Sequence, residues 1–280
     1  MDATTEEVKS ALLEAIENDQ LVLPTLPEIA LQVRDAANDP NTDIKRLNTL
    51  ISNDAALSAR VLRVANSPLV RGSQTIDNLP SALGRLGVSY SCNLVIGLAM
   101  EQMFQATNEV IDARMREVWS RSAEVAAIAS VLAQHYTKLE ADKATLARLT
   151  HLIGVLPILT YAEENEVLLD GGNSEQPDQL IADLSPMIGE KILATWKFPE
   201  SLWVVPQEHL DLQRDSSVTD YVDVVIVARL QSYGYGSDDA DTPHWQDIPA
   251  FAKLGLDMSE ESMELDQLSE DISMATQVLQ

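Results

Sequence analysis

The sequence predicts an all-α protein built from two helical lobes. Hydrophobic residues make up 45% of the chain but aromatic residues only 5%, so Ala, Leu, Val and Ile supply the apolar content, a mix that favours packed helices over a β-sandwich. Apolar residues recur at helical spacing along the chain, and no alternating run of useful length indicates a strand. The 280 residues are enough for one large domain or two modest ones.

The first part of the chain predicts short helices bounded by capping and breaking residues. Prolines at 24 and 27 keep the segment around them extended, Thr42 or Asp43 and Asp54 are typical N-caps, and Asn66-Ser67-Pro68 ends a helix. The predicted helices cover about residues 6–16, 29–37, 43–51, 55–65, 79–86 and 91–107. The last is apolar on nearly every face, so we expect it to be central.

The second part predicts longer helices at 113–139 and 143–164, followed by others near 177–183, 185–195, 199–208 and 219–233. This change of pattern predicts a domain boundary near residue 108, which separates lobes 1–107 and 108–236 from an acidic tail, 237–280. An apolar seam runs along the tail, formed by Leu265, Leu268, Ile272, Ala275 and Leu279. That seam is typical of a terminal helix docked on its own domain or of a helix offered to a partner.

Charge and cysteine content exclude several classes of function. The formal net charge of −25 repels phosphate, so we expect no nucleic-acid partner and no membrane partner. A single cysteine, Cys92, excludes a disulfide framework and a thiolate metal cluster. The acidic N-terminus lacks the features of a signal peptide, and no apolar run approaches 18 residues. These features predict a cytoplasmic protein.

Residues 55–100 are locally basic in this acidic chain, because they hold four arginines and one acid, Asp77. Two interpretations remain open for the arginines. They either balance an acidic neighbouring lobe or form a docking patch for an acidic protein or a nucleotide. The residues concerned are Arg60, Arg63, Arg71 and Arg85.

The N-terminal part resembles the HDOD family, the HD-related output domains of bacterial signalling proteins. The resemblance extends from about Ile16 to about Tyr235, with one departure where Ala55 replaces the proline of an Asp-Pro-Ala-Leu pattern. The motifs that carry it, in family order, are LPTLP (23–27), NDP (38–40), LISNDAAL (50–57), LRVANSP (62–68) and ALGRLG (82–87). The resemblance implies an N-terminal HDOD helical bundle followed by an HD-like helical lobe.

It also implies a relationship to HD phosphohydrolases, which bind divalent metals through histidines, a His-Asp pair and a final aspartate. Other residues hold most of these positions here: Arg121 for the first His, Leu152 for the Asp after His151, Ser185 for a further His, Glu208-His209 for a His-His pair, and Arg229 for the last Asp. Leucine removes a bridging carboxylate and arginine adds a permanent cation, so we expect no tight metal, no cofactor and no hydrolysis.

The remaining residues of this pocket each have two interpretations. His151 is either a hydrogen-bonded core histidine or part of a relic binding pocket, and Glu208 with His209 is either a loop pair or a ligand contact. Arg121 either pairs with Glu117 or Glu124 at helical spacing or makes the pocket an anion site.

We therefore favour a non-catalytic regulatory module that acts by binding a signalling protein or a ligand. One alternative is an HD-type metal-dependent phosphohydrolase for a nucleotide or phosphoester, which would combine His151, His209 and Glu208 with Asp220 or Asp223. Another is a metal-free binder of a nucleotide second messenger through Arg121.

Overall fold

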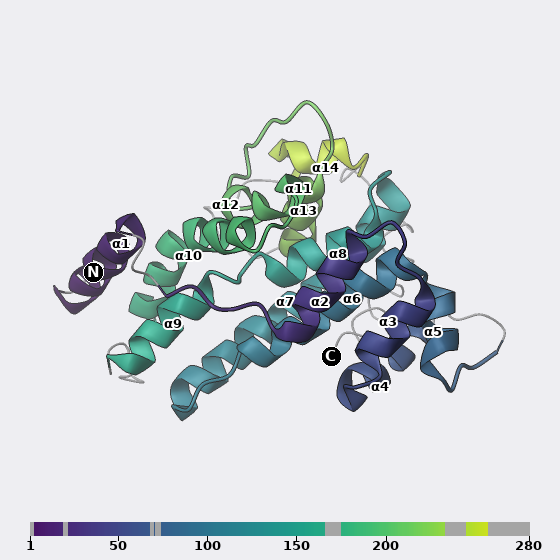
Figure 1. Ribbon diagram of the computed structural model, residues 1–280. Helices are drawn as coiled ribbons and strands as arrows, with labels where there is room; N and C mark the ends of the chain where they lie inside the picture. Colours follow the sequence, from purple (N-terminus) through teal and green to yellow (C-terminus); the bar gives the residue numbers. More distant parts are fainter. Residues whose placement is uncertain are drawn as a thin grey trace.

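The computed structural model describes residues 3–18, 22–67, 70, 74–165, 175–232 and 245–256. All regular elements in this part of the chain are helices, which confirms the predicted all-α class (Figure 1). They are α1 Ala3–Glu17, α2 Glu28–Ala37, α3 Ile44–Ile51, α4 Ala55–Ala65, α5 Leu79–Leu86, α6 Val88–Met100, the 3₁₀ helix η1 Glu101–Met103, α7 Glu109–Tyr136, α8 Ala141–Thr150, α9 Val155–Glu164, α10 Glu175–Thr195, α11 Glu200–Trp203, α12 Val205–Glu208, α13 Tyr221–Ser232, the 3₁₀ helix η2 Trp245–Asp247 and α14 Pro249–Lys253. The predicted apolar seam of the tail lies outside the described residues.

Two predicted helix starts are confirmed in atomic detail. The Asp43 side chain accepts a hydrogen bond from the backbone N–H of Arg46 at 2.8 Å, and Asp54 accepts one from Leu57 at 2.9 Å. Each carboxylate thereby satisfies a backbone donor that the first turn of its helix would leave unpaired.

Several predicted helix bounds are wrong. The helix predicted at 199–208 is divided into α11 and α12, and the one predicted at 91–107 ends as an α-helix at Met100 and continues as η1 only to Met103. The stretch 143–164 is not one helix, because a turn at residues 151–154 divides it into α8 and α9. Conversely, residues 177–195 belong to the single helix α10, which continues through Pro186. A proline inside a helix removes one hydrogen bond, but Leu184 and Ile188 on either side are buried in the core, and their packing keeps the helix continuous.

The core is continuous across the predicted boundary near residue 108. Helix α6, predicted to be central, is buried over most of its length and packs against α2 and α8. Helix α7 in turn packs against α8 and α13. Helix α1 lies apart from α2–α5, beside α10 (Figure 1), where Lys9 forms an ion pair with Asp183 at 2.5 Å. The division into lobes stays a prediction, and α1 packs on a helix of the second one.

One segment, Ala141–Glu164, is long and apolar enough to cross a membrane by composition. However, 83% of its most apolar window is buried inside the protein. The bent pair Leu79–Leu86 and Val88–Met103 passes the same test only if both helices count as one span. The core of a helical protein requires apolar helices that are mostly buried, so packing in the core explains the apolar composition of these segments.

Candidate functional site

Close backbone contacts bring the end of α8 near the end of α12. A Cβ atom on Gly154, the last residue of the turn, would lie 2.0 Å from the carbonyl oxygen of Ser185 in α10. A Cβ atom on Gly189, one turn further along α10, would lie 2.9 Å from the Pro206 side chain in α12. These distances leave room only for glycine, so the turn packs on α10 at backbone contact and the Pro206 side chain of α12 packs directly on Gly189. His151 begins the turn after α8, and His209 follows α12.

The two histidines form a buried pair. Their ring centroids are 4.9 Å apart and the ring planes are nearly perpendicular, at 86°. Nδ1 of His151 lies 2.6 Å from the carbonyl oxygen of Arg148, and Nδ1 of His209 lies 2.9 Å from that of Pro206. Since a carbonyl oxygen only accepts, Nδ1 carries the proton in both neutral rings. The prediction of a hydrogen-bonded core histidine at 151 is confirmed.

The pair is held neutral by burial and by positive charge. Burial, followed by the charges of Arg148 and His209, lowers the pKa of His151 well below its ordinary value. Burial, followed by the charges of Arg229 and Arg148, lowers the pKa of His209 to about 3. The Arg148 side chain is itself buried and lies one helical turn before His151. We refer to His151, His209, Arg148 and Arg229 as the basic pocket.

The carboxylates next to this pocket are bound to other cations. Arg214 reaches Glu208 at 2.5 Å, Asp220 at 2.6 Å and Asp223 at 3.4 Å. Lys253 of α14 adds a contact to Asp223 at 3.2 Å. Asp223 is completely buried, and burial raises the pKa of its carboxyl group. We call these five residues the charge cluster.

This donor set does not fit the metal that HD enzymes bind. The basic pocket offers two imidazoles beside two guanidiniums, whereas a divalent cation needs several neutral or anionic donors. Among the residues that the structure describes, no group of three or more His, Cys, Asp or Glu side chains is arranged to hold a metal ion. Glu208 is directed to Arg214 and not to the histidine beside it in sequence.

The structure places Arg121 on the surface, where its side chain is 65% exposed and pairs with Glu117 at 2.6 Å. The ion pair predicted from helical spacing is therefore present. The positive charge that acts on the histidines comes from Arg148 and Arg229 instead. Sequence reasoning placed Arg229 at a pocket position but missed Arg148, whose only signal is its position one turn before His151.

The four arginines of the predicted docking patch have different environments. Arg60 forms an ion pair with Glu101, and Arg85 donates to the backbone oxygens of Ala65 and Gln74 at 3.0 and 2.6 Å. Arg85 is thus bound to the C-terminal end of α4 and to the segment between α4 and α5. Arg63 is exposed and forms no ion pair within the described part of the chain, and Arg71 lies outside that part.

Comparison with known proteins decides the family. The sequence profile of the HDOD domain matches residues 23–212. The chain belongs to the HDOD domain family. This HDOD protein is similar over its whole length to a solved structure from Shewanella amazonensis SB2B, described as a "Putative metal-dependent phosphohydrolase", with 30% identity, full coverage of both chains and a TM-score of 0.87.

Two more distant relatives extend the comparison. An "HDOD domain protein with unknown function" from Geobacter sulfurreducens shares the fold at 21% identity, with a TM-score of 0.67, over 98% of this chain and 97% of its own. An "Uncharacterized protein" of Treponema pallidum (strain Nichols) is 21% identical over 236 residues. That match covers 80% of this HDOD protein but only 44% of the Treponema protein, so the chain spans less than half of that curated relative.

Proposed function

We propose that this HDOD protein is a non-catalytic regulatory module that acts by binding a signalling protein or a ligand. The observation that carries the proposal is the composition of the basic pocket. Where HD enzymes gather metal ligands, this chain gathers two neutral histidines and two arginines. A cation next to a guanidinium is repelled by about 4 kcal/mol per unit charge at a separation of about 4 Å and an effective dielectric of about 20.

The alternative, a metal-dependent phosphohydrolase, has one point in its favour. The Shewanella relative carries that description at 30% identity. However, the reaction requires carboxylates that hold the cation and acidify its bound water. In this chain Glu208, Asp220 and Asp223 are engaged by Arg214, and releasing them would leave that partly buried cation without its partners.

The two functions are separated by an activity assay with a pocket variant as reference. Phosphomonoesters, phosphodiesters and nucleotides are incubated with Mn²⁺, Fe²⁺ or Ni²⁺ and either the wild type or His151→Gln. The proposal expects no turnover that depends on His151. Hydrolysis by the wild type that is lost in His151→Gln contradicts the proposal and supports the phosphohydrolase.

A metal-free nucleotide messenger would be detected on the same protein by thermal denaturation. A ligand that binds the folded state raises the melting temperature with concentration. A nucleotide-induced rise that disappears in Arg121→Gln would support the messenger-binding alternative. A rise that survives this substitution would place a nucleotide elsewhere on the protein.

A further inference from the structure

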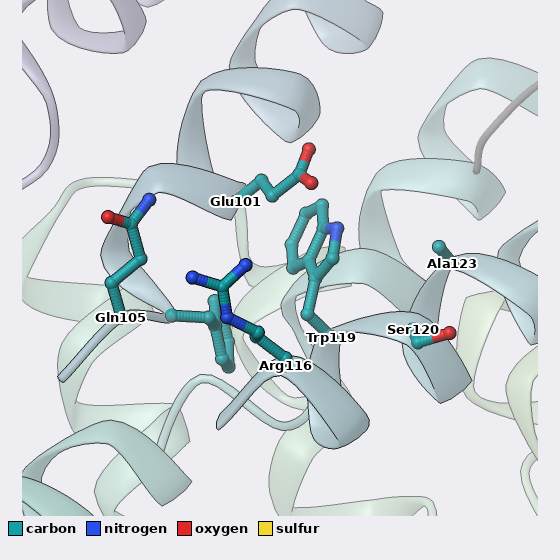
Figure 2. Close-up of a pocket in the computed structure, with 7 residues that line it drawn as sticks. Glu101, Gln105, Arg116, Trp119, Ser120 and Ala123 are labelled. Atoms are coloured by element: carbon teal, nitrogen blue, oxygen red, sulfur yellow. The ribbon is translucent and has the colours of Figure 1, made fainter. Parts of the chain in front are cut away.

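A cavity of about 410 Å³ lies between η1 and the first half of α7 (Figure 2). This volume is within the range of small-molecule sites, about 300–1,000 Å³. Its lining consists of Glu101, Phe104, Gln105, Arg116, Trp119, Ser120 and Ala123, none of which belongs to the basic pocket or the charge cluster. Phe104 and Trp119 are the aromatic part of this lining; their ring centroids are 5.3 Å apart, and only a small part of each residue remains exposed.

The polar side chains that line the cavity retain unused hydrogen-bonding groups. Arg116 bonds to Asp112 through Nε at 2.7 Å, while its terminal Nη1 and Nη2 have no acceptor among the residues that the structure describes. Glu101 meets Arg60 through Oε2 only. Figure 2 shows the Arg116 guanidinium and the Gln105 amide on one side of the Trp119 ring and the Glu101 carboxylate above it. A planar guanidinium with free terminal nitrogens fits a carboxylate bidentately.

The charges around the cavity are balanced. Glu101 is paired with Arg60 and Arg116 with Asp112, so each charged side chain at the cavity has a partner of opposite charge. The field of Glu101 also reaches Arg116, since it contributes, after the hydrogen bond to Asp112, to raising the pKa of Arg116. A ligand with one positive and one negative group preserves this balance, whereas a phosphate would bring extra negative charge beside Glu101 and Asp112.

We propose that this cavity binds a small zwitterion of the α-amino-acid class with an aromatic side chain. Its carboxylate binds the Nη1 and Nη2 groups of Arg116, its ammonium group binds the carboxylate of Glu101, and its ring packs on Trp119 and Phe104. Because η1 follows α6 directly and Arg60 lies on α4, an occupied site connects α4, η1 and α7. The inference does not depend on the basic pocket, so it can fail while the proposed function holds.

Isothermal titration of the full chain tests this site with defined probes. L-phenylalanine is compared with phenethylamine, which lacks the carboxylate, and with 3-phenylpropionate, which lacks the ammonium group. We expect L-phenylalanine to bind with a dissociation constant of about 1 mM or lower and each truncated probe to bind at least about tenfold more weakly. No heat from L-phenylalanine or L-tryptophan at about 10 mM would overturn the proposal.

A matched pair of variants locates the binding. Arg116→Gln removes the guanidinium at the cavity, and Arg121→Gln removes one from the same helix that makes the same kind of i,i+4 pair outside the cavity. Arg116 is 68% exposed, so its replacement leaves the fold intact. We expect affinity for L-phenylalanine to fall at least about tenfold in Arg116→Gln and to stay at the wild-type value in Arg121→Gln. Equal affinities in both variants, or AMP binding more tightly than L-phenylalanine, would refute the proposal.

Discussion

Acidification from pH 7.5 to pH 5.0 should destabilise this protein through the buried histidine pair. In the unfolded chain both imidazoles titrate near 6.5, whereas in the folded protein the pKa of His209 is about 3 and that of His151 is far below 6.5. As the pH falls below 6.5, the unfolded state therefore gains protons that the folded state does not. Each histidine leaves stability unaffected above its unfolded pKa and lowers the free energy of unfolding below it.

For His209 the magnitude follows from the unfolded pKa alone, because a folded pKa of about 3 keeps its ring neutral at pH 5.0. Between pH 7.5 and 5.0 His209 therefore lowers the free energy of unfolding by about 2 kcal/mol, and His151, whose pKa is lowered in the same direction, adds to this loss. In His209→Gln one titrating group is gone, and the same pH change should cost about 2 kcal/mol less than in the wild type. Any constant effect of the substitution cancels in this comparison.

Urea denaturation followed by far-UV circular dichroism at the two pH values measures these differences. His135→Gln is the control, because the His135 side chain is exposed on α7 and its removal should leave the pH effect as in the wild type. Asp223, whose pKa is raised by burial, acts equally in all three proteins. The reasoning is refuted if the wild type loses less than about 1 kcal/mol, or if His209→Gln and His135→Gln behave alike.

Two further predictions concern packing and buried charge. Gly154→Ala should lower the free energy of unfolding by about 3 kcal/mol or more, because its Cβ would overlap the Ser185 backbone. Gly84→Ala, whose Cβ would lie 3.9 Å from its nearest neighbour, should instead stabilise α5 by about 0.5–1 kcal/mol. Urea denaturation that gives both variants the same change in the free energy of unfolding would contradict this prediction. Arg214→Gln should cost about 3 kcal/mol, because among the described residues it leaves Lys253 as the one cation paired with the buried Asp223. Arg121→Gln breaks an exposed ion pair, so its melting temperature should equal that of the wild type. Equal melting temperatures for Arg214→Gln and Arg121→Gln would contradict a stabilising role of the charge cluster.

The parts of the fold that the sequence predicts correctly depend on interactions between residues close together in the chain. Asp43 and Asp54 begin α3 and α4 as capping chemistry predicts, since a cap depends only on residues within one turn. The break at residues 151–154 was not predictable, because an apolar stretch gives no sign of a turn whose position is set by contact between Gly154 and α10. The separation predicted between 183 and 185 is absent, since burial of Leu184 and Ile188 on either side of Pro186 outweighs the hydrogen bond that this proline removes.

The candidate site was predictable only where the family resemblance supplied positions. His151, His209 and Arg229 come together as that resemblance implies. Arg148 and the partners of Arg214 depend on which faces of α8, α12 and α13 meet, and single-sequence patterns do not carry that information. Of the two interpretations left open for Arg121, the ion pair at helical spacing is present, because residues four apart on an exposed helix can pair with each other.

Metal content tests the central claim most directly, namely that the basic pocket has exchanged metal ligands for fixed positive charge. Protein purified without chelator is analysed by mass spectrometry for metals, then titrated calorimetrically with Mn²⁺, Fe²⁺ and Ni²⁺. The proposed function predicts less than about 0.1 metal per chain and no heat of binding at micromolar affinity. About one or two metals per chain, lost together in His151→Gln and His209→Gln, would contradict it and establish a metal centre in the HD position.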